Sequence, residues 1–264
     1  MGFSPCPNDT FIFDALANNK IDTKGLHFRI MLADVQTLNQ QAINKDLDIT
    51  KISYGVLPLV KDCYHLLNSG SALGTGVGPL LIASQELNIE EIDDCIIAIP
   101  GKDTTAHLLF ALAFPKANNK IFIPYDQIED YVINSASTKV AGVIIHENRF
   151  TYSERGLFKV LDLGEFWQEK TGGAIPLGGI VGKKVLGSSI LNDVNSLIAE
   201  SVKYALEQYP YISEYVKMNA REMEESVMRK HIDLYVNKYT LNLGEDGMKA
   251  VTTLLDVYES IHSK

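Results

Sequence analysis

The stretch CIIAIPGKDTTAHLLFALAF, residues 95–114, contains an unbroken apolar run, a polar turn and a segment with helical periodicity. Residues 95–100 are apolar without alternation, as in a strand that is covered on both faces. Within 104–114 the leucines recur at the spacing of one helix face. The stretch therefore predicts a buried strand that leads directly into an amphipathic helix.

The same order of strand and helix continues along the chain. Strand-like runs dominate the middle of the chain, at 47–52, 78–84 and 140–145. Helical patterns dominate its last third, at 190–205, 222–236 and 245–261. Apolar strands that alternate with helices are typical of α/β proteins. We therefore predict an α/β fold with a parallel-rich sheet covered on both faces.

The composition excludes some classes of partner. The 264 residues include 24 Lys and Arg against 33 Asp and Glu, a formal net charge of −9. This acidic balance argues against binding to nucleic acid or to anionic membranes, because affinity for phosphate depends on Lys and Arg. No apolar run approaches the ~20 residues that a membrane span needs.

The cysteines and histidines predict neither a disulfide framework nor a metal site. Cys6, Cys63 and Cys95 are far apart and form no CxxC pair, and no HExxH spacing occurs. The N-terminal residues 1–16 lack the basic and apolar regions of a secretory signal. We therefore expect a protein of the reducing cytoplasm.

Polar segments follow four of the strand-like runs, at 4–10, 51–54, 101–105 and 146–149. Ligands of open α/β sheets bind beyond the carboxyl ends of the strands. In the first segment two prolines fix the backbone, and Asn8 or Asp9 can cap the next helix. A preorganised binding loop is about equally consistent with this segment, whereas Asp9 alone is better explained as a cap.

The segments at 101–105 and 146–149 offer an anion site and a base. Thr104 and Thr105 open a helix whose free N–H groups attract anions, although plain helix capping explains them too. His146 ends a strand, and an imidazole is the natural base at neutral pH, but a structural histidine is the simpler interpretation. Alternation along the strand would put Asn148 on the same face as His146.

Two other features have simpler explanations. The glycine-rich residues 74–79 precede a strand rather than a helix, so they do not fit a dinucleotide-binding loop. We interpret them as closely packed backbone of the kind that can form the wall of a cleft. Trp167 is interpreted as a packed aromatic residue.

Taken together, the longer polar strings resemble one enzyme family. The match is to the 1,4-dihydroxy-6-naphthoate synthase family of the futalosine route to menaquinone, and SPCPNDTF and IIHENRFTY are its most specific strings. The matching segments lie in order at 2–16, 34–42, 48–55, 100–106, 143–152 and 162–180. Family members usually carry several more apolar residues before GFSPCPND than this chain does.

The resemblance implies a fold like that of type II periplasmic binding proteins, with mixed sheets flanked by helices and a cleft between two lobes. Residues 1–88 plus 183–264 would form lobe 1, and 89–182 would form lobe 2. It also implies a lyase that converts cyclic dehypoxanthinyl futalosine to 1,4-dihydroxy-6-naphthoate. No cofactor or metal is expected, and the partner would be a small-molecule carboxylate.

The resemblance also assigns roles to individual residues. His146 matches the proposed catalytic base, and Ser53, Thr104 and Thr105 match residues that would hold the carboxylate and hydroxyl groups. Asn39 lies in a matching polar segment, and we count Asn8 with the substrate-binding residues. Lys51 is either a charge partner of the substrate or part of a structural ion pair.

Three other functions fit the same pattern. A solute-binding protein of this fold would close on a small carboxylate without chemistry, the chorismate-dehydrating enzyme of the same pathway shares the fold, and a cytoplasmic ligand-sensing domain is the third. The two specific strings favour the naphthoate synthase. If so, Ser53, Thr105 and His146 should face one cleft.

Overall fold

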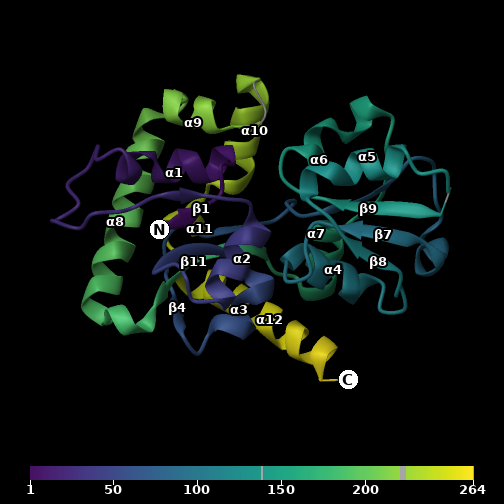
Figure 1. The fold of residues 1–264 in the computed structure, drawn as a ribbon, viewed down its shortest axis with the longest axis horizontal. Coiled ribbons are helices and arrows are strands. Elements are labelled where there is room, and N and C mark those ends of the chain that lie inside the picture. Colours follow the sequence, from purple (N-terminus) through teal and green to yellow (C-terminus); the bar gives the residue numbers. More distant parts are fainter. Residues whose placement is uncertain (138, 221–223, 264) are drawn as a thin grey trace.

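A computed structural model describes residues 1–137, 139–220 and 224–263 of the chain. The described residues form two mixed β-sheets, each with its own helices, that stand side by side (Figure 1). We call the part built on the N-terminal sheet the first lobe and the other part the second lobe. None of the described helices combines the length and the apolar character needed to cross a membrane.

The first sheet has the strand order β2-β1-β3-β11-β4, and β5 also pairs with β11. Its short N-terminal strands run parallel, with β1 between β2 and β3, whereas β11 is antiparallel to β3, β4 and β5. The strands are β1 (Gly2–Phe3), β2 (Met31–Leu32), β3 (Ile49–Ser53), β4 (Tyr64–Leu66), β5 (Ala72–Gly74) and β11 (Ile175–Lys183).

The second sheet has the order β10-β6-β9-β7-β8. Here β7 is parallel to β8 and β9, and β6 is antiparallel to β9 and β10. The strands are β6 (Leu80–Ala83), β7 (Ile96–Ile99), β8 (Lys120–Phe122), β9 (Val140–Ile144) and β10 (Phe158–Asp162). The mixed sheets of the predicted fold class are confirmed, but the expectation of a parallel-rich sheet is wrong, because β6 and β11 run against their neighbours.

The helices confirm the predicted pattern in both lobes. The first lobe carries α1 (Pro7–Ala17), α2 (Val35–Ile43), α3 (Leu57–Val60), α8 (Ser188–Gln208), α9 (Glu214–Asn219), α10 (Glu225–Tyr235), α11 (Lys238–Leu241) and α12 (Gly244–His262). The second lobe carries α4 (Thr105–Ala113), α5 (Ile128–Ile133), α6 (Asn148–Thr151) and α7 (Leu163–Thr171). Short 3-10 turns are η1 (Tyr54–Val56), η2 (Ile89–Asp94), η3 (Tyr125–Gln127), η4 (Tyr152–Arg155) and η5 (Lys184–Leu186). The helix predicted at 222–236 corresponds to α10, and residues 222 and 223 lie outside the described residues.

The strands divide between the sheets at points that differ from the predicted lobe boundaries. Strand β6 precedes residue 88 but belongs to the second sheet, and β11 precedes residue 183 but belongs to the first. Apolar pattern alone does not say which sheet a buried strand joins, because any buried sheet accepts such a strand. The second lobe therefore includes β6, and the first lobe includes β11, although the predicted boundaries placed each of these strands in the other lobe.

Each lobe has a core of its own, and a third cluster connects them. Phe3 and Phe13 pack with ring centroids 4.6 Å apart in the first lobe, beneath α1 and α8. In the second lobe Ile82 and Ile144 lie in a separate cluster. Trp167 is fully buried and donates its indole N–H to the Ala174 carbonyl at 3.1 Å, which confirms its interpretation as a packed aromatic residue.

Candidate active site

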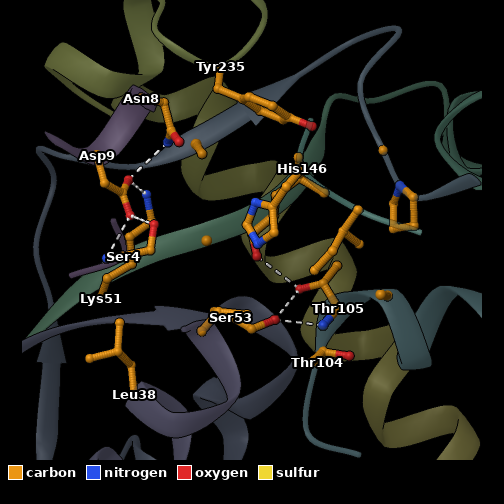
Figure 2. Close-up of a pocket in the computed structure, with 18 of the residues that line it drawn as sticks. Ser4, Asn8, Asp9, Leu38, Lys51, Ser53, Thr104, Thr105, His146 and Tyr235 are labelled. Atoms are coloured by element: carbon orange, nitrogen blue, oxygen red, sulfur yellow. Dashed lines mark hydrogen bonds and ion pairs between the residues drawn. The ribbon is translucent and has the colours of Figure 1, made fainter. Parts of the chain in front are cut away.

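A cleft lies where the two lobes face each other, and it encloses about 720 Å³ including its open mouth (Figure 2). Both lobes contribute to it. Its polar lining residues are Ser4, Asn8, Asp9, Lys51, Ser53, Thr104, Thr105, His146, His231 and Tyr235. The three residues expected to share one cleft, Ser53, Thr105 and His146, therefore do line it together.

The wall of the cleft includes the end of the glycine-rich segment. Gly78 and Pro79 line the cleft, as the interpretation of residues 74–79 predicted. A Cβ atom on Gly78 would come within 2.7 Å of the Gly164 backbone, so a larger side chain would push the two segments apart. Arg149 also binds this segment through the carbonyl of Gly78.

Asp9 and Lys51 form a buried ion pair at one end of the cleft. The Asp9 side chain also accepts hydrogen bonds from the Ser4 hydroxyl at 2.7 Å and the Asn8 amide at 2.9 Å. The interpretation of Asp9 as a plain helix cap is wrong, because Cys6 occupies the N-cap position of α1. A lysine inside the strand-like run 47–52 was the available signal, since a buried ammonium needs a buried partner.

Ser53 and Thr105 connect the lobes through a short hydrogen-bond network. Their hydroxyl oxygens are 2.8 Å apart, and the Thr105 N–H donates to Ser53 Oγ at 2.6 Å. Thr105 Oγ1 also accepts from the Gly55 N–H and donates to the Leu177 carbonyl. Because the Thr105 hydroxyl donates its proton to the Leu177 carbonyl, the bond between the two hydroxyls is donated by Ser53. Thr105 Oγ1 then has no hydrogen-bonding capacity left, whereas Ser53 Oγ keeps one lone pair that can accept from a ligand hydroxyl.

Replacing Thr105 with valine should both weaken substrate binding and lower stability. The valine would leave the Gly55 N–H and the Leu177 carbonyl without their partner, which costs about 1–3 kcal/mol for a buried group. Thr105→Ser is the matched control, because it keeps the hydroxyl. Urea denaturation and KM measured for both variants would test this, and equal stability of the two would contradict it.

Asn39 supports the site from behind and does not line the cleft. Its side-chain oxygen accepts from the Ser53 N–H at 2.9 Å, and its amide donates to the Asp103 carbonyl at 2.9 Å. Asn39 is fully buried, and both ends of its amide are used. In this structure Asn39 therefore fixes Ser53 and the turn before α4, which differs from the direct substrate contact that we expected.

His146 enters the cleft from a tight turn after β9. The strand ends at Ile144, and His146 has a left-handed backbone with a φ of 58°. Non-glycine residues with positive φ are uncommon and concentrate at functional sites. The prediction that Asn148 shares its face is wrong, because strand alternation has already stopped and Asn148 begins α6.

The surroundings of His146 favour its neutral form. Burial lowers the pKa of the imidazole below its usual 6.5, and the negative charges of Glu147 and Asp9 offset part of this effect. The Tyr125 ring meets it edge-on with centroids 4.9 Å apart. A neutral imidazole in an enclosed cleft can accept a proton at neutral pH.

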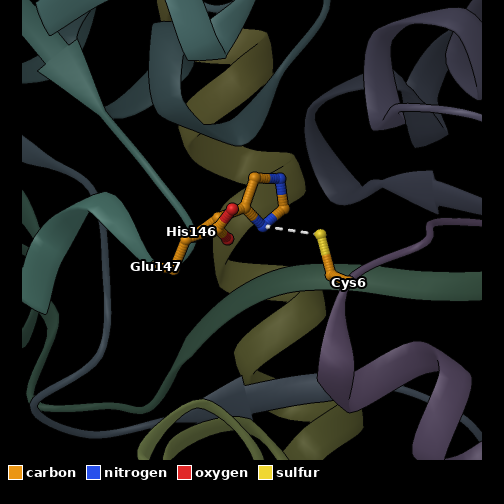
Figure 3. Close-up of side chains that lie close together, drawn as sticks. All are labelled: Cys6, His146 and Glu147. Atoms are coloured by element: carbon orange, nitrogen blue, oxygen red, sulfur yellow. Dashed lines mark hydrogen bonds between the residues drawn. The ribbon is translucent and has the colours of Figure 1, made fainter. Parts of the chain in front are cut away.

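Two residues of the site were not predicted from the sequence. The thiol of Cys6 lies 3.5 Å from His146 Nδ1, and Cys6, His146 and Glu147 place potential metal-ligand atoms within 4.8 Å of one another (Figure 3). His231 is 1% exposed, and neither of its ring nitrogens has a hydrogen-bond partner among the residues that the structure describes. The pattern of α10 places His231 beside Met228 and Ile232 on a buried face, which from sequence indicates core packing.

The unpartnered nitrogens of His231 predict that its replacement stabilises the ligand-free protein. Burial lowers the pKa of His231 well below 6.5, so the ring is neutral and carries one donor and one acceptor without partners. His231→Phe removes both, and a gain of up to about 1–3 kcal/mol in unfolding free energy is expected. The control is His107→Phe, since His107 Nδ1 is bonded to the Lys102 carbonyl at 2.7 Å. A loss of stability in His231→Phe would contradict the prediction.

Comparisons with known proteins show the family to which the chain belongs. A family model described as menaquinone biosynthesis matches residues 1–260. The chain is 39% identical to a 1,4-dihydroxy-6-naphthoate synthase from Thermus thermophilus over 254 residues, 96% of this chain and 91% of that protein. It is 38% identical to one from Streptomyces coelicolor over 260 residues, 97% of this chain and 90% of that protein.

Solved structures give the same picture of the fold. Protein AF1704 from Archaeoglobus fulgidus has a TM-score of 0.91 at 31% identity, covering 98% of this chain and 96% of its own. The Candida albicans CA3427 product, described as having the generic periplasmic binding protein fold, has a TM-score of 0.69 at 10% identity over 99% of this chain and 93% of its own. The second likeness concerns the fold alone, and it confirms the predicted fold class.

Proposed function

The chain belongs to the menaquinone-biosynthesis family, and on this premise we propose that it is a lyase that converts cyclic dehypoxanthinyl futalosine to 1,4-dihydroxy-6-naphthoate, with His146 as general base. The observation that carries the proposal is a neutral imidazole inside a cleft whose two lobes supply hydroxyl groups and a helix N-terminus. We place the reaction in the cytoplasm, in keeping with the free thiols of Cys6, Cys63 and Cys95.

The main catalytic group that the reaction needs is a proton acceptor. Loss of the sugar-derived fragment from the spiro-cyclic substrate makes an aromatic ring, which supplies driving force. Removal of a carbon-bound proton by a neutral imidazole starts this change, and the enclosed cleft keeps competing water away. His146 would take that proton, while the surrounding polar groups hold the substrate in place.

The N-terminus of α4 is the proposed site for the substrate carboxylate. Thr104, Thr105 and Ala106 line the cleft at the start of this helix, where free N–H groups and the helix dipole favour an anion. The Thr105 N–H already donates to Ser53, so the Ala106 N–H is the donor left for the carboxylate. Ser53 Oγ can accept a substrate hydroxyl beside it.

The proposed roles of Asn8 and Lys51 lie at the other end of the cleft. Lys51 lines the cleft while its ammonium pairs with Asp9, so it offers remaining N–H donors with its charge largely offset. Asn8 donates its amide to the same carboxylate and lines the cleft with its side-chain oxygen available. Both groups would bind uncharged oxygens of the sugar-derived fragment.

Incubation of the purified protein with cyclic dehypoxanthinyl futalosine tests the function. We expect 1,4-dihydroxy-6-naphthoate to form, identified by its mass and aromatic absorbance. Chorismate in a parallel reaction tests the dehydratase alternative. Binding of the substrate with no product, under conditions where a Thermus thermophilus or Streptomyces coelicolor relative turns it over, would favour a binding protein and overturn the proposal.

A further inference from the structure

Cys6 contacts His146 from the opposite lobe (Figure 3). Cys6 lies between β1 and α1 in the first lobe, whereas His146 and Glu147 lie in the turn after β9 in the second. The contact joins Cys6 Sγ to His146 Nδ1 over 3.5 Å. It exists only while the two lobes are as close as they are here.

The position of the thiol is fixed by its own backbone. Cys6 is the N-cap of α1, flanked by Pro5 and Pro7, and its carbonyl accepts from the N–H groups of Asp9 and Thr10, both at 3.0 Å. Its side chain makes no capping bond to the helix, which leaves the sulfur free to contact His146. A residue this constrained can hold a partner in one orientation.

The thiol beside His146 is neutral. Burial raises the pKa of Cys6, and the nearby Glu147 carboxylate raises it further, so the sulfur is a weak nucleophile that keeps lone pairs to accept a hydrogen bond. A histidine that uses Nε2 as a base must carry its proton on Nδ1. The sulfur lies 3.5 Å from Nδ1 and can be that acceptor, and the Glu147 carboxylate lies in the same cluster of three side chains.

Resting on the proposed function, we propose that Cys6 is a positioning residue for the base. Its sulfur accepts the Nδ1–H of His146 and keeps Nε2 unprotonated and turned toward the substrate. When the substrate C–H bond breaks, its proton goes to Nε2 and its electron pair stays in the substrate. The imidazolium then still donates its Nδ1–H in a hydrogen bond to the sulfur, and the Glu147 carboxylate offsets the new positive charge.

The contact also couples catalysis to closure of the cleft. Opening the lobes separates Sγ from Nδ1, and the imidazole loses the partner that selects its tautomer. The base is therefore oriented while the two lobes are as close as they are here. A positioned base that forms on closure limits proton transfer to the state from which bulk water is excluded.

The test compares Cys6→Ala, Cys6→Ser and the control Cys63→Ala, which alters a cysteine outside the cleft-lining residues. Loss of one net hydrogen bond predicts a kcat about fivefold lower in Cys6→Ala with KM within about twofold, because the substrate contacts remain. Cys6→Ser restores an acceptor and should regain most of kcat. Cys63→Ala should match the unaltered protein.

A second readout needs no turnover and separates this inference from the proposed function. Nitrogen-15 NMR of labelled histidine, assigned with His146→Asn, should show His146 protonated at Nδ1 in the unaltered protein and a mixture of tautomers in Cys6→Ala. Protonation at Nε2 in the unaltered protein would overturn the inference even if neither Cys6 variant folds, and so would equal kcat in Cys6→Ala. Absence of product from the unaltered protein would instead overturn the proposed function and leave the tautomer result standing.

Discussion

Replacing His146 with alanine should lower the turnover of cyclic dehypoxanthinyl futalosine by about 10²–10⁴-fold, the usual contribution of a positioned acid–base group. The proposed substrate contacts of Ser53 and the α4 N-terminus remain in this variant, so KM should change little. His107→Ala is the matched control, because His107 lies on α4 outside the cleft-lining residues. Steady-state kinetics of the two variants would measure the difference.

The same residue predicts the pH dependence of the rate. Burial lowers the pKa of His146, so the imidazole stays neutral and able to accept a proton below pH 6.5. The rate should therefore hold between neutral pH and 6.5 and fall only at more acidic pH, as the base becomes protonated. Near-normal turnover in a folded His146→Ala variant would remove His146 from the mechanism, and Lys51 would be the next candidate.

Replacing Asp9 with asparagine should lower the free energy of unfolding by about 3–5 kcal/mol, because a buried charge is left without its partner. Lys51 is 7% exposed and Asp9 1%, so little water reaches the ammonium once the carboxylate is gone. Asparagine preserves the shape of the side chain and an acceptor for the Ser4 hydroxyl. The change is thus mainly one of charge, and urea denaturation would measure it.

Two comparisons identify the cause of that loss. Asp48→Asn removes a carboxylate that pairs with Lys183 at 3.1 Å but is 67% exposed on its side chain, so its effect should stay below about 1 kcal/mol. The double variant Asp9→Leu with Lys51→Met removes both charges and should recover much of the stability lost in Asp9→Asn. If Asp9→Asn and Asp48→Asn lowered the free energy of unfolding by the same amount, the buried pair would stabilise the fold no more than the exposed pair does.

The local pattern of the sequence was enough to place four strands, β3, β6, β7 and β9, and four helices, α4, α8, α10 and α12. Unbroken apolar runs predicted β7 and β9, because a strand that is buried on both faces is apolar at every position. Leucines at helical spacing predicted α4, because a helix that is buried on one face repeats its apolar residues every three to four positions. The strings around His146 and Thr105 predicted that these residues share a cleft, which the structure confirms.

Patterns of this kind gave wrong predictions where a strand ended earlier than expected, and where the neighbouring strand in the sheet was distant in the sequence. Alternation misplaced Asn148, because the strand had ended at Ile144 and the chain had entered a left-handed turn. The lobe boundaries that the resemblance implied also left β6 and β11 in the wrong lobes, and the apolar pattern could not correct them, since a buried strand carries no sign of which sheet it joins.

The sequence by itself determined the order of strands and helices, the family and the chemical groups available to the site. The tertiary structure alone decided that Asp9 pairs with Lys51, 42 positions away, and that Cys6 meets His146, 140 positions away. Hydrophobic period is a property of neighbouring residues, whereas the protonation and orientation of a buried group depend on whatever the fold packs against it. The Asp9–Lys51 pair forms where α1 meets β3 within the first lobe, whereas the Cys6–His146 contact forms only when the N-terminal turn of that lobe is brought against the end of β9 in the other.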